Sequence, residues 1–131
     1  MASPMTIRLD EKQLAKLHRW AQAIPGATPS GLARQLVDEG LRMADHPGVL
    51  FRDGPGGRRA ALAIGPEVWE IVMSLRAIDG RRGAAGAAGE APSLPQTQMK
   101  IAMRYYAAYP DEIHLAIDLA VRGEFAAAAA R

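Results

Sequence analysis

Apolar and polar side chains alternate over residues 5–9, and helical spacing replaces this alternation directly afterwards. Alternation is typical of a half-buried strand, here with Thr6 and Arg8 on the outward face. Asp10 is placed to cap a following helix, with Gln13 three residues on as in a capping box. The inward strand positions are Met5, Ile7 and Leu9, and the apolar stripe of the helix is Leu14, Leu17, Ala21 and Ile24.

A second helix is predicted between two breaks in the pattern. Pro25-Gly26 ends the first helix, and Thr28–Ser30 combines hydroxyl caps with a proline suited to a first turn. His46–Gly48 ends the second helix. Its apolar stripe consists of Leu32, Leu36, Val37 and Leu41.

A strand followed by two short helices cannot complete a core alone. The strand over 5–9 has no partner within residues 1–46, and the two helices cannot enclose their own apolar stripes. Two copies related by a twofold axis would pair their strands as an antiparallel ribbon and cover it with four helices. The sequence therefore predicts a homodimer.

The pattern changes after Pro47. Residues 49–52 and 58–62 flank a turn-rich loop, which indicates a β-hairpin. Gly65-Pro66 opens a helix, and the Gly-, Ala- and Arg-rich residues 79–93 are predicted to be a flexible segment or a weak short helix. The helix stripes of this half are Val68, Trp69, Val72 and Leu75, then Met99, Ala102, Met103 and Tyr106, then Ile113, Ala116, Ile117, Ala120 and Val121, with a break at Tyr109-Pro110.

These patterns predict a mainly α fold with short β elements and two domains. Residues 1–46 would form the strand–helix–helix dimerisation domain, and residues 47–131 a hairpin with three to four helices.

Composition agrees with a folded protein, since 49% of the residues are apolar and 23% are charged. The absence of cysteine excludes disulfides and thiolate metal sites and fits the cytoplasm, where we expect the protein to lie. We expect no signal peptide and no membrane association.

The pattern resembles the ribbon–helix–helix family of bacterial repressors and antitoxins. The matching residues are 5–12 (MTIRLDEK) and 28–41 (TPSGLARQLVDEGL), about a third of the chain. The second half resembles a small helical domain, related to helix–turn–helix folds, that is often attached to antitoxins. That likeness rests on residues 51–60 (FRDGPGGRRA), 65–70 (GPEVWE) and 102–113 (AMRYYAAYPDEI), whereas the middle helix of that domain has no clear counterpart in residues 83–92.

Together the two resemblances imply the antitoxin of a bacterial toxin–antitoxin pair whose toxin is a PIN-like ribonuclease. The ribbon resemblance implies that Thr6 and Arg8 from both copies enter the major groove of operator DNA, where arginine can donate two hydrogen bonds to guanine. Thr28 and Ser30, at a helix start, would contact a backbone phosphate, and Lys12 could add another such contact. The alternative is that these side chains cap helices or face solvent.

Partner-binding candidates lie in the second half of the chain. Arg52, Arg58 and Arg59 would form a basic cluster on the hairpin, suited to DNA flanks or to the acidic site of a nuclease. Tyr105 lies off the predicted stripe of its helix and is a surface candidate, and Phe125 could anchor a partner. The alternatives are that the hairpin arginines are solvated and that the aromatic residues fill a core.

The sequence argues against an enzyme or a cofactor protein. His18, His46 and His114 are scattered without metal-ligand spacing, and no phosphate loop or nucleophile motif appears. The sequence also leaves open a stand-alone repressor with a C-terminal oligomerisation or sensing domain, and an adaptor that does not touch DNA. A net charge of only +2 requires any DNA-binding surface to be local.

Overall fold

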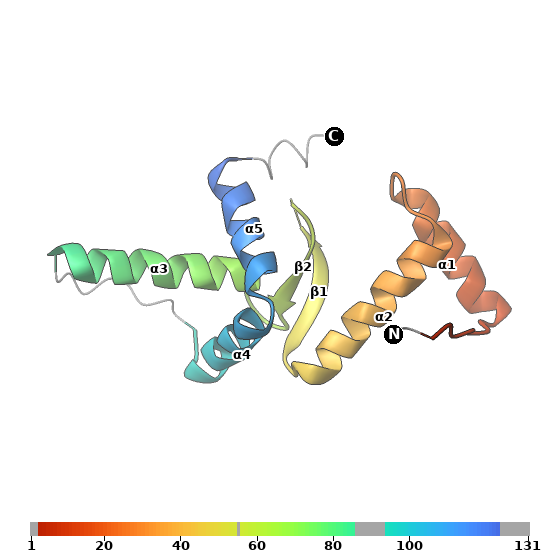
Figure 1. Cartoon of the computed structure of the whole chain (residues 1–131), viewed down its shortest axis with the longest axis horizontal. Coiled ribbons are helices and arrows are strands. Elements are labelled where there is room, and N and C mark those ends of the chain that lie inside the picture. The colour runs from red at the N-terminus through yellow and green to blue at the C-terminus, as the bar shows by residue number, and fades with distance from the viewer. Residues whose placement is uncertain (1–2, 55, 86–93, 124–131) are drawn as a thin grey trace. The chain divides into compact units, whose positions relative to one another are not determined.

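The computed structural model describes residues 3–54, 56–85 and 94–123, and only the backbone of residues 79–85. Five helices and one two-stranded antiparallel sheet lie in these ranges (Figure 1). The mainly α fold with short β elements is therefore confirmed. The chain divides into two compact units, an N-terminal unit of Met1–Leu41 and a C-terminal unit of Arg42–Arg131.

Local signals in the sequence define the two helices that begin in the N-terminal unit. Helix α1 spans Glu11–Ala23 and has the predicted capping box: Gln13 N donates to Asp10 Oδ1 at 2.7 Å, and Asp10 N donates to Gln13 Oε1 at 3.1 Å. Gly26, with φ +78°, permits the turn that follows. Helix α2 spans Pro29–Asp45, and the Thr28 hydroxyl accepts a hydrogen bond from Gly31 N at 3.0 Å.

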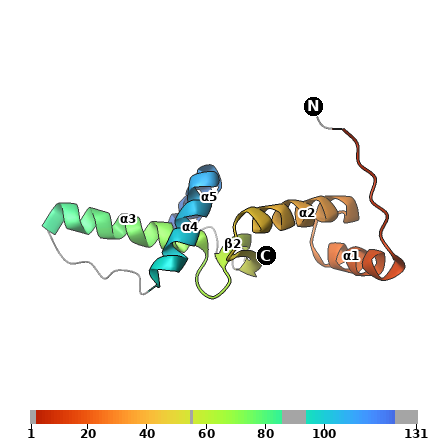
Figure 2. The same ribbon diagram turned by 90° about the horizontal axis from the view of Figure 1, so that it is seen from below.

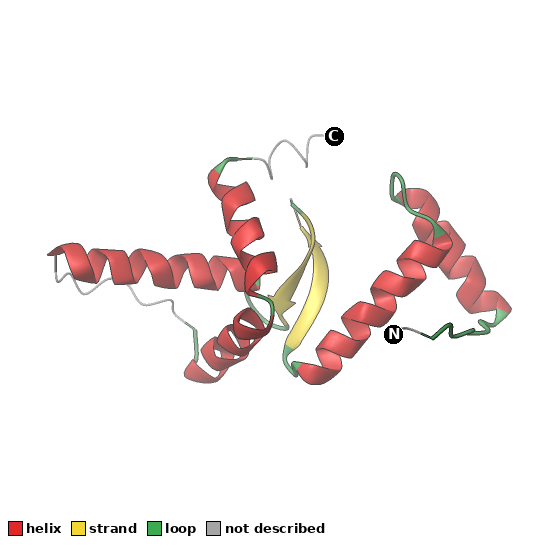
Figure 3. Cartoon of the chain, viewed as in Figure 1, coloured by secondary structure: helices red, strands yellow, loops and turns green. Residues whose placement is uncertain are grey.

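The segment predicted as a strand forms no strand in the single chain. Residues 3–10 are drawn as loop ahead of α1 (Figure 3), and the one sheet of the described residues is the hairpin farther along the chain. The physical reason is the one that predicted dimerisation, because a strand is defined by its ladder and this segment has no second strand to pair with.

The division between the units falls inside α2, whereas the sequence pattern placed it after residue 46. A helix is continuous along the backbone, but its side chains can belong to different cores. The last turn of α2 contributes Arg42, which bonds to residues of the C-terminal unit, and the next residue after the helix, His46, is buried there. Periodicity alone marks the end of the helix and not the change of core.

The predicted hairpin is confirmed, with strands β1 (Val49–Gly54) and β2 (Gly57–Leu62) in antiparallel register from Val49 opposite Leu62 to Gly54 opposite Gly57. Gly48 has φ +96°, and a Cβ there would lie 2.7 Å from Ile101 Cδ1. The backbone angle therefore favours glycine at this turn into β1, and a side chain here would also have to displace the end of the Ile101 side chain.

Helix α3 spans Val68–Ala85, so residues 79–85 are helical rather than part of a flexible segment over 79–93. Residues 86–93 lie outside the described residues. Gly80 and Gly83 each lower helix propensity by about 1 kcal/mol, but an α-helix already started by a packed first half can continue through such residues, since propagation costs less than nucleation. Val68, Ile71 and Val72 supply that packing, each no more than 2% exposed.

Helix α4 (Gln96–Ala108) and helix α5 (Pro110–Val121) meet at Tyr109, as the predicted break indicated. Helices α3 and α4 pack against the hairpin, and α5 packs against α3 and α4 (Figures 1 and 2). The buried residues at the centre of this unit are Val49, Ala60, Leu62, Val68, Ile71, Val72, Ala102, Tyr105, Ile113 and Ile117.

The inward face of α4 differs from the predicted stripe. Tyr105 is fully buried and Met103 is 38% exposed, so the prediction that Tyr105 faces the surface is wrong. Contacts with the hairpin and with α3 rotate the buried face toward Ala102 and Tyr105. The sequence pattern could not distinguish the two rotations, because tyrosine occupies both position 105 and position 106, and either tyrosine can fill a core.

Candidate functional site

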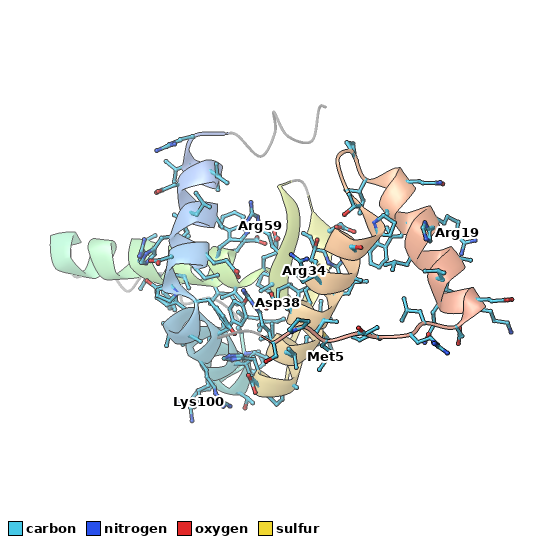
Figure 4. All side chains as sticks on the ribbon, turned by 45° about the vertical axis from the view of Figure 1, so that its right-hand side comes forward. Met5, Arg19, Arg34, Asp38, Arg59 and Lys100 are labelled. Atoms are coloured by element: carbon cyan, nitrogen blue, oxygen red, sulfur yellow. The ribbon has the colours of Figure 1, made fainter. Side chains whose placement is uncertain are left out.

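Thr6 and Arg8 are both exposed in the segment before α1. Their apolar neighbours are exposed too: Met5, which is labelled in Figure 4, is 82% exposed and Ile7 is 59% exposed. Exposure alone therefore does not separate an inward from an outward face of this segment, but Ile7 and Leu9 line an apolar groove and Thr6 and Arg8 do not. If another surface buried Met5, Ile7 and Leu9, Thr6 and Arg8 would face the opposite, open side, because side chains alternate along an extended chain.

An apolar groove lies within the N-terminal unit. It has a volume of about 830 Å³ and is formed by the segment before α1 together with both helices. Its lining residues are Ile7, Leu9, Gln13, Leu14, Lys16, Leu17, His18, Trp20, Pro29, Ser30, Ala33, Leu36 and Val37. Among the described residues of this unit, the fully buried apolar side chains are only Ala21 and Leu32. Leu14 and Leu17 of the first predicted stripe thus line a groove and not a closed core, and so do Leu36 and Val37 of the second.

The polar candidates around the start of α2 have different surroundings. The Thr28 hydroxyl is occupied in capping α2, and Ser30 lines the apolar groove. Lys12 is exposed in the first turn of α1. Thr28 can still contact a phosphate, because a hydroxyl that accepts a hydrogen bond keeps its own donor.

The three hairpin arginines do not form one cluster. Arg52 lies opposite Arg59 in the register, while Arg58 lies opposite Asp53 and hence on the other face of the hairpin. Arg52 donates to the Gly65 carbonyl at 2.6 Å, and Arg59 donates to the Gly56 carbonyl at 3.2 Å. These bonds stabilise the turns at either end of the hairpin, so both arginines have a structural role.

A polar network that the sequence did not indicate joins the end of α2 to α4 and α5. Arg42 donates to Glu112 Oε1 at 2.7 Å and to the Tyr105 hydroxyl at 3.0 Å. The Tyr105 hydroxyl in turn donates to Glu112 Oε2 at 2.6 Å. The Arg42 guanidinium also lies 4.1 Å from the ring centroid of Tyr109, within the range of a cation–π contact.

The protonation states in this network follow from its geometry. Burial raises the pKa of the Tyr105 hydroxyl well above its ordinary value, and its hydrogen bond to the Glu112 carboxylate raises that pKa further. Burial alone lowers the pKa of the Arg42 guanidinium, but the bonds to Glu112 and Tyr105 outweigh it, so this pKa is raised overall. The network therefore holds a charged arginine and a neutral phenol at neutral pH.

Sequence reasoning missed this network because its members lie far apart in the chain. Arg42 and Glu112 are 70 positions apart, and Glu112 in a first helical turn has a sufficient local explanation in the helix dipole. No local pattern connects the two residues. The remaining partner candidate, Phe125, lies outside the described residues.

Within the described ranges, no group of three or more histidine, aspartate or glutamate side chains is arranged as a metal site. None of the helices in these ranges has the length and apolarity needed to cross a membrane. No protein-family model, curated protein or solved structure matches the chain.

Proposed function

We propose that the chain is the antitoxin of a bacterial type II toxin–antitoxin system. A homodimer formed through residues 1–46 binds the promoter of its own operon, and the region from residue 47 onward neutralises a PIN-like ribonuclease toxin in the cytoplasm. The toxin and its class follow from the family resemblances of the sequence. The DNA-binding and dimerisation part has, in addition, support from the geometry of the N-terminal unit.

The observation that carries the proposal is the apolar groove beside an unpaired extended segment. Soluble monomers rarely leave an apolar surface of this extent open to water, so the groove requires an occupant. A second copy supplies both missing parts, because its segment 5–9 can pair with the first and its helices can cover the groove. Pairing would turn Met5, Ile7 and Leu9 inward and direct Thr6 and Arg8 toward DNA.

Arg8→Ala is expected to abolish specific promoter binding while the dimer persists. A bidentate contact to guanine contributes about 1–3 kcal/mol, and a homodimer loses it twice, so we expect a loss of about 2–6 kcal/mol. A gel-shift titration on the chain's own promoter measures this loss, with size-exclusion chromatography reporting the dimer. Arg19→Ala is the matched control, because Arg19 is an exposed arginine on α1 (Figure 4). Equal promoter affinity for Arg8→Ala and the parent chain would refute the assignment.

The C-terminal unit is expected to bind the toxin by itself, without binding DNA. Because Arg42 and His46 belong to that unit, the fragment to test is 42–131 rather than 47–131. Co-expressed with the product of the neighbouring gene, fragment 42–131 should co-purify with it and relieve growth arrest, and it should not shift the promoter. Relief of growth arrest by residues 1–46 alone contradicts this division of roles.

A stand-alone repressor is the second candidate. The C-terminal unit has its own core and its own polar network, which suits an oligomerisation or sensing domain as well as a toxin-binding one. A chain that binds the promoter but captures no product of the neighbouring gene would favour this candidate.

A further inference from the structure

A small hollow in the C-terminal unit combines features that none of the proposed roles uses. It has a volume of about 200 Å³ and lies between the turn after α2 and the outer side of α4. Its lining residues are His46, Pro47, Thr97, Lys100, Ile101 and Arg104. No aspartate or glutamate is among them, so the charged groups at this hollow are all positive.

The two cations of the hollow lie on one face of α4 and repel each other. Lys100 and Arg104 are four positions apart, which places them as neighbours on a helix surface, and Thr97 precedes Lys100 by one turn. Both are exposed (Lys100 is labelled in Figure 4), and neither forms a hydrogen bond or ion pair with another of the described residues. A bound anion would remove this repulsion.

The opposite wall of the hollow is fixed in place. The His46 ring is 8% exposed and packs edge-on against Tyr105, with the ring centroids 5.3 Å apart. Its Nδ1 is buried without a hydrogen-bond partner among the described residues, so the ring has unused hydrogen-bonding capacity. The backbone of Gly48, next to Pro47 in the turn, lies close to the Ile101 side chain of α4. A preformed wall lowers the ordering cost of binding.

From these features we propose that the hollow binds a phosphate group. Its volume of about 200 Å³ is sufficient for one compact oxyanion. Two cations and the Thr97 hydroxyl match a group that carries up to two negative charges and several acceptor oxygens. A single carboxylate would neutralise only one of the cations. The site is independent of the proposed ribbon and would stand if the ribbon failed.

The test is a titration of the ¹⁵N-labelled full chain with sodium phosphate, against sodium chloride at matched ionic strength. We expect saturable shifts of the backbone amides of Thr97, Lys100, Ile101 and Arg104. The Lys100→Gln/Arg104→Gln variant should bind phosphate at least about tenfold more weakly, since both charge-assisted contacts are lost. Both positions are exposed, so the fold should be retained, and circular dichroism checks this.

The matched control is Arg19→Gln/Arg34→Gln, which removes the same charge from two exposed helix positions outside the hollow. It should leave the phosphate affinity unchanged. Shifts that do not saturate, shifts that are not confined to the hollow, or equal weakening in the control would overturn the proposal.

A second arm identifies the source of the phosphate. The full chain and the Lys100→Gln/Arg104→Gln variant are titrated with duplex DNA that lacks the promoter sequence, over a range of salt concentrations. If the variant flattens the dependence of log K on log salt by about 0.9 for each lost contact, the phosphates are those of the DNA backbone. If the slope is unchanged while inorganic phosphate binding is lost, the ligand is a free phosphate or a small phosphate ester.

Discussion

Val37→Glu is expected to convert the homodimer into a monomer and to abolish promoter binding with it. Val37 is 49% exposed in the single chain and lines the apolar groove of the N-terminal unit. The substitution therefore leaves the packing of the single chain intact. In the proposed dimer it places two unpaired carboxylates in a closed core, and each costs several kcal/mol when taken out of water. Dimer affinity should fall by at least about a thousandfold, which corresponds to about 4 kcal/mol.

Sedimentation equilibrium over a range of concentrations measures this change directly. Leu115→Glu is the matched control, since Leu115 is 57% exposed on α5 and lies outside the groove. It should remain a dimer with unchanged promoter affinity. A Val37→Glu chain that stays dimeric at micromolar concentration would show that the groove is not the dimer interface, and the ribbon assignment would then have to be abandoned.

Tyr105→Phe is expected to lower the free energy of unfolding of the C-terminal unit by about 1–3 kcal/mol. The ring would still fill the core, but Arg42 and Glu112 would each lose a hydrogen bond to the hydroxyl. Tyr109→Phe is the matched control. The Tyr109 ring lies under the Arg42 guanidinium, and a phenylalanine ring would keep this cation–π contact. Urea unfolding followed by circular dichroism separates the two. Equal stability of both variants would show that the Tyr105 hydroxyl contributes nothing.

The raised pKa of Tyr105 predicts how the free energy of unfolding changes at alkaline pH. Burial and the bond to Glu112 raise the pKa of Tyr105 in the folded chain above its ordinary value of 10.0. The folded state therefore favours the protonated phenol, and this contribution is fully present below pH 10 and is lost as the pH rises above it. Unfolding curves between pH 9 and pH 12 should show this loss in the parent chain. The Tyr105→Phe variant should lack the part of this stability loss that the Tyr105 hydroxyl causes. An identical loss of stability at alkaline pH in both chains would contradict the linkage.

Short-range signals were sufficient to predict the hairpin and the starts of the helices. They also predicted a strand over 5–9 that the single chain lacks, and they did not predict that α3 continues through residues 79–85. The Asp10–Gln13 capping box, the break at Pro25-Gly26, the hydroxyl cap at Thr28 and the restart at Tyr109-Pro110 each act within a few residues, and each was found where the sequence indicated it. The hairpin was predictable for the same reason, because its turn-rich loop and flanking strands are adjacent in the chain.

Residues whose partners are distant in the chain could not be placed in this way. Tyr105 was predicted at the surface, but contacts with the hairpin and with α3 turn it into the core, where it meets Arg42 from a helix that begins in the other unit. The hairpin arginines were predicted as one cluster, but the register separates Arg58 from Arg52 and Arg59. Which side of a helix is buried, and what lies against each face of a strand, depend on residues that are distant in the chain.

By itself the sequence determined where the helices begin, the hairpin and the incomplete core of residues 1–46, because capping, turn formation and hydrophobic periodicity are local properties of the chain. Only the tertiary structure decided that α2 ends in the C-terminal unit, that Arg42, Tyr105 and Glu112 form one network, and that Lys100 and Arg104 face the same hollow as His46. Burial and hydrogen bonding between distant residues arise only when the elements pack, since the free energy of a contact depends on both partners and on the water that packing removes.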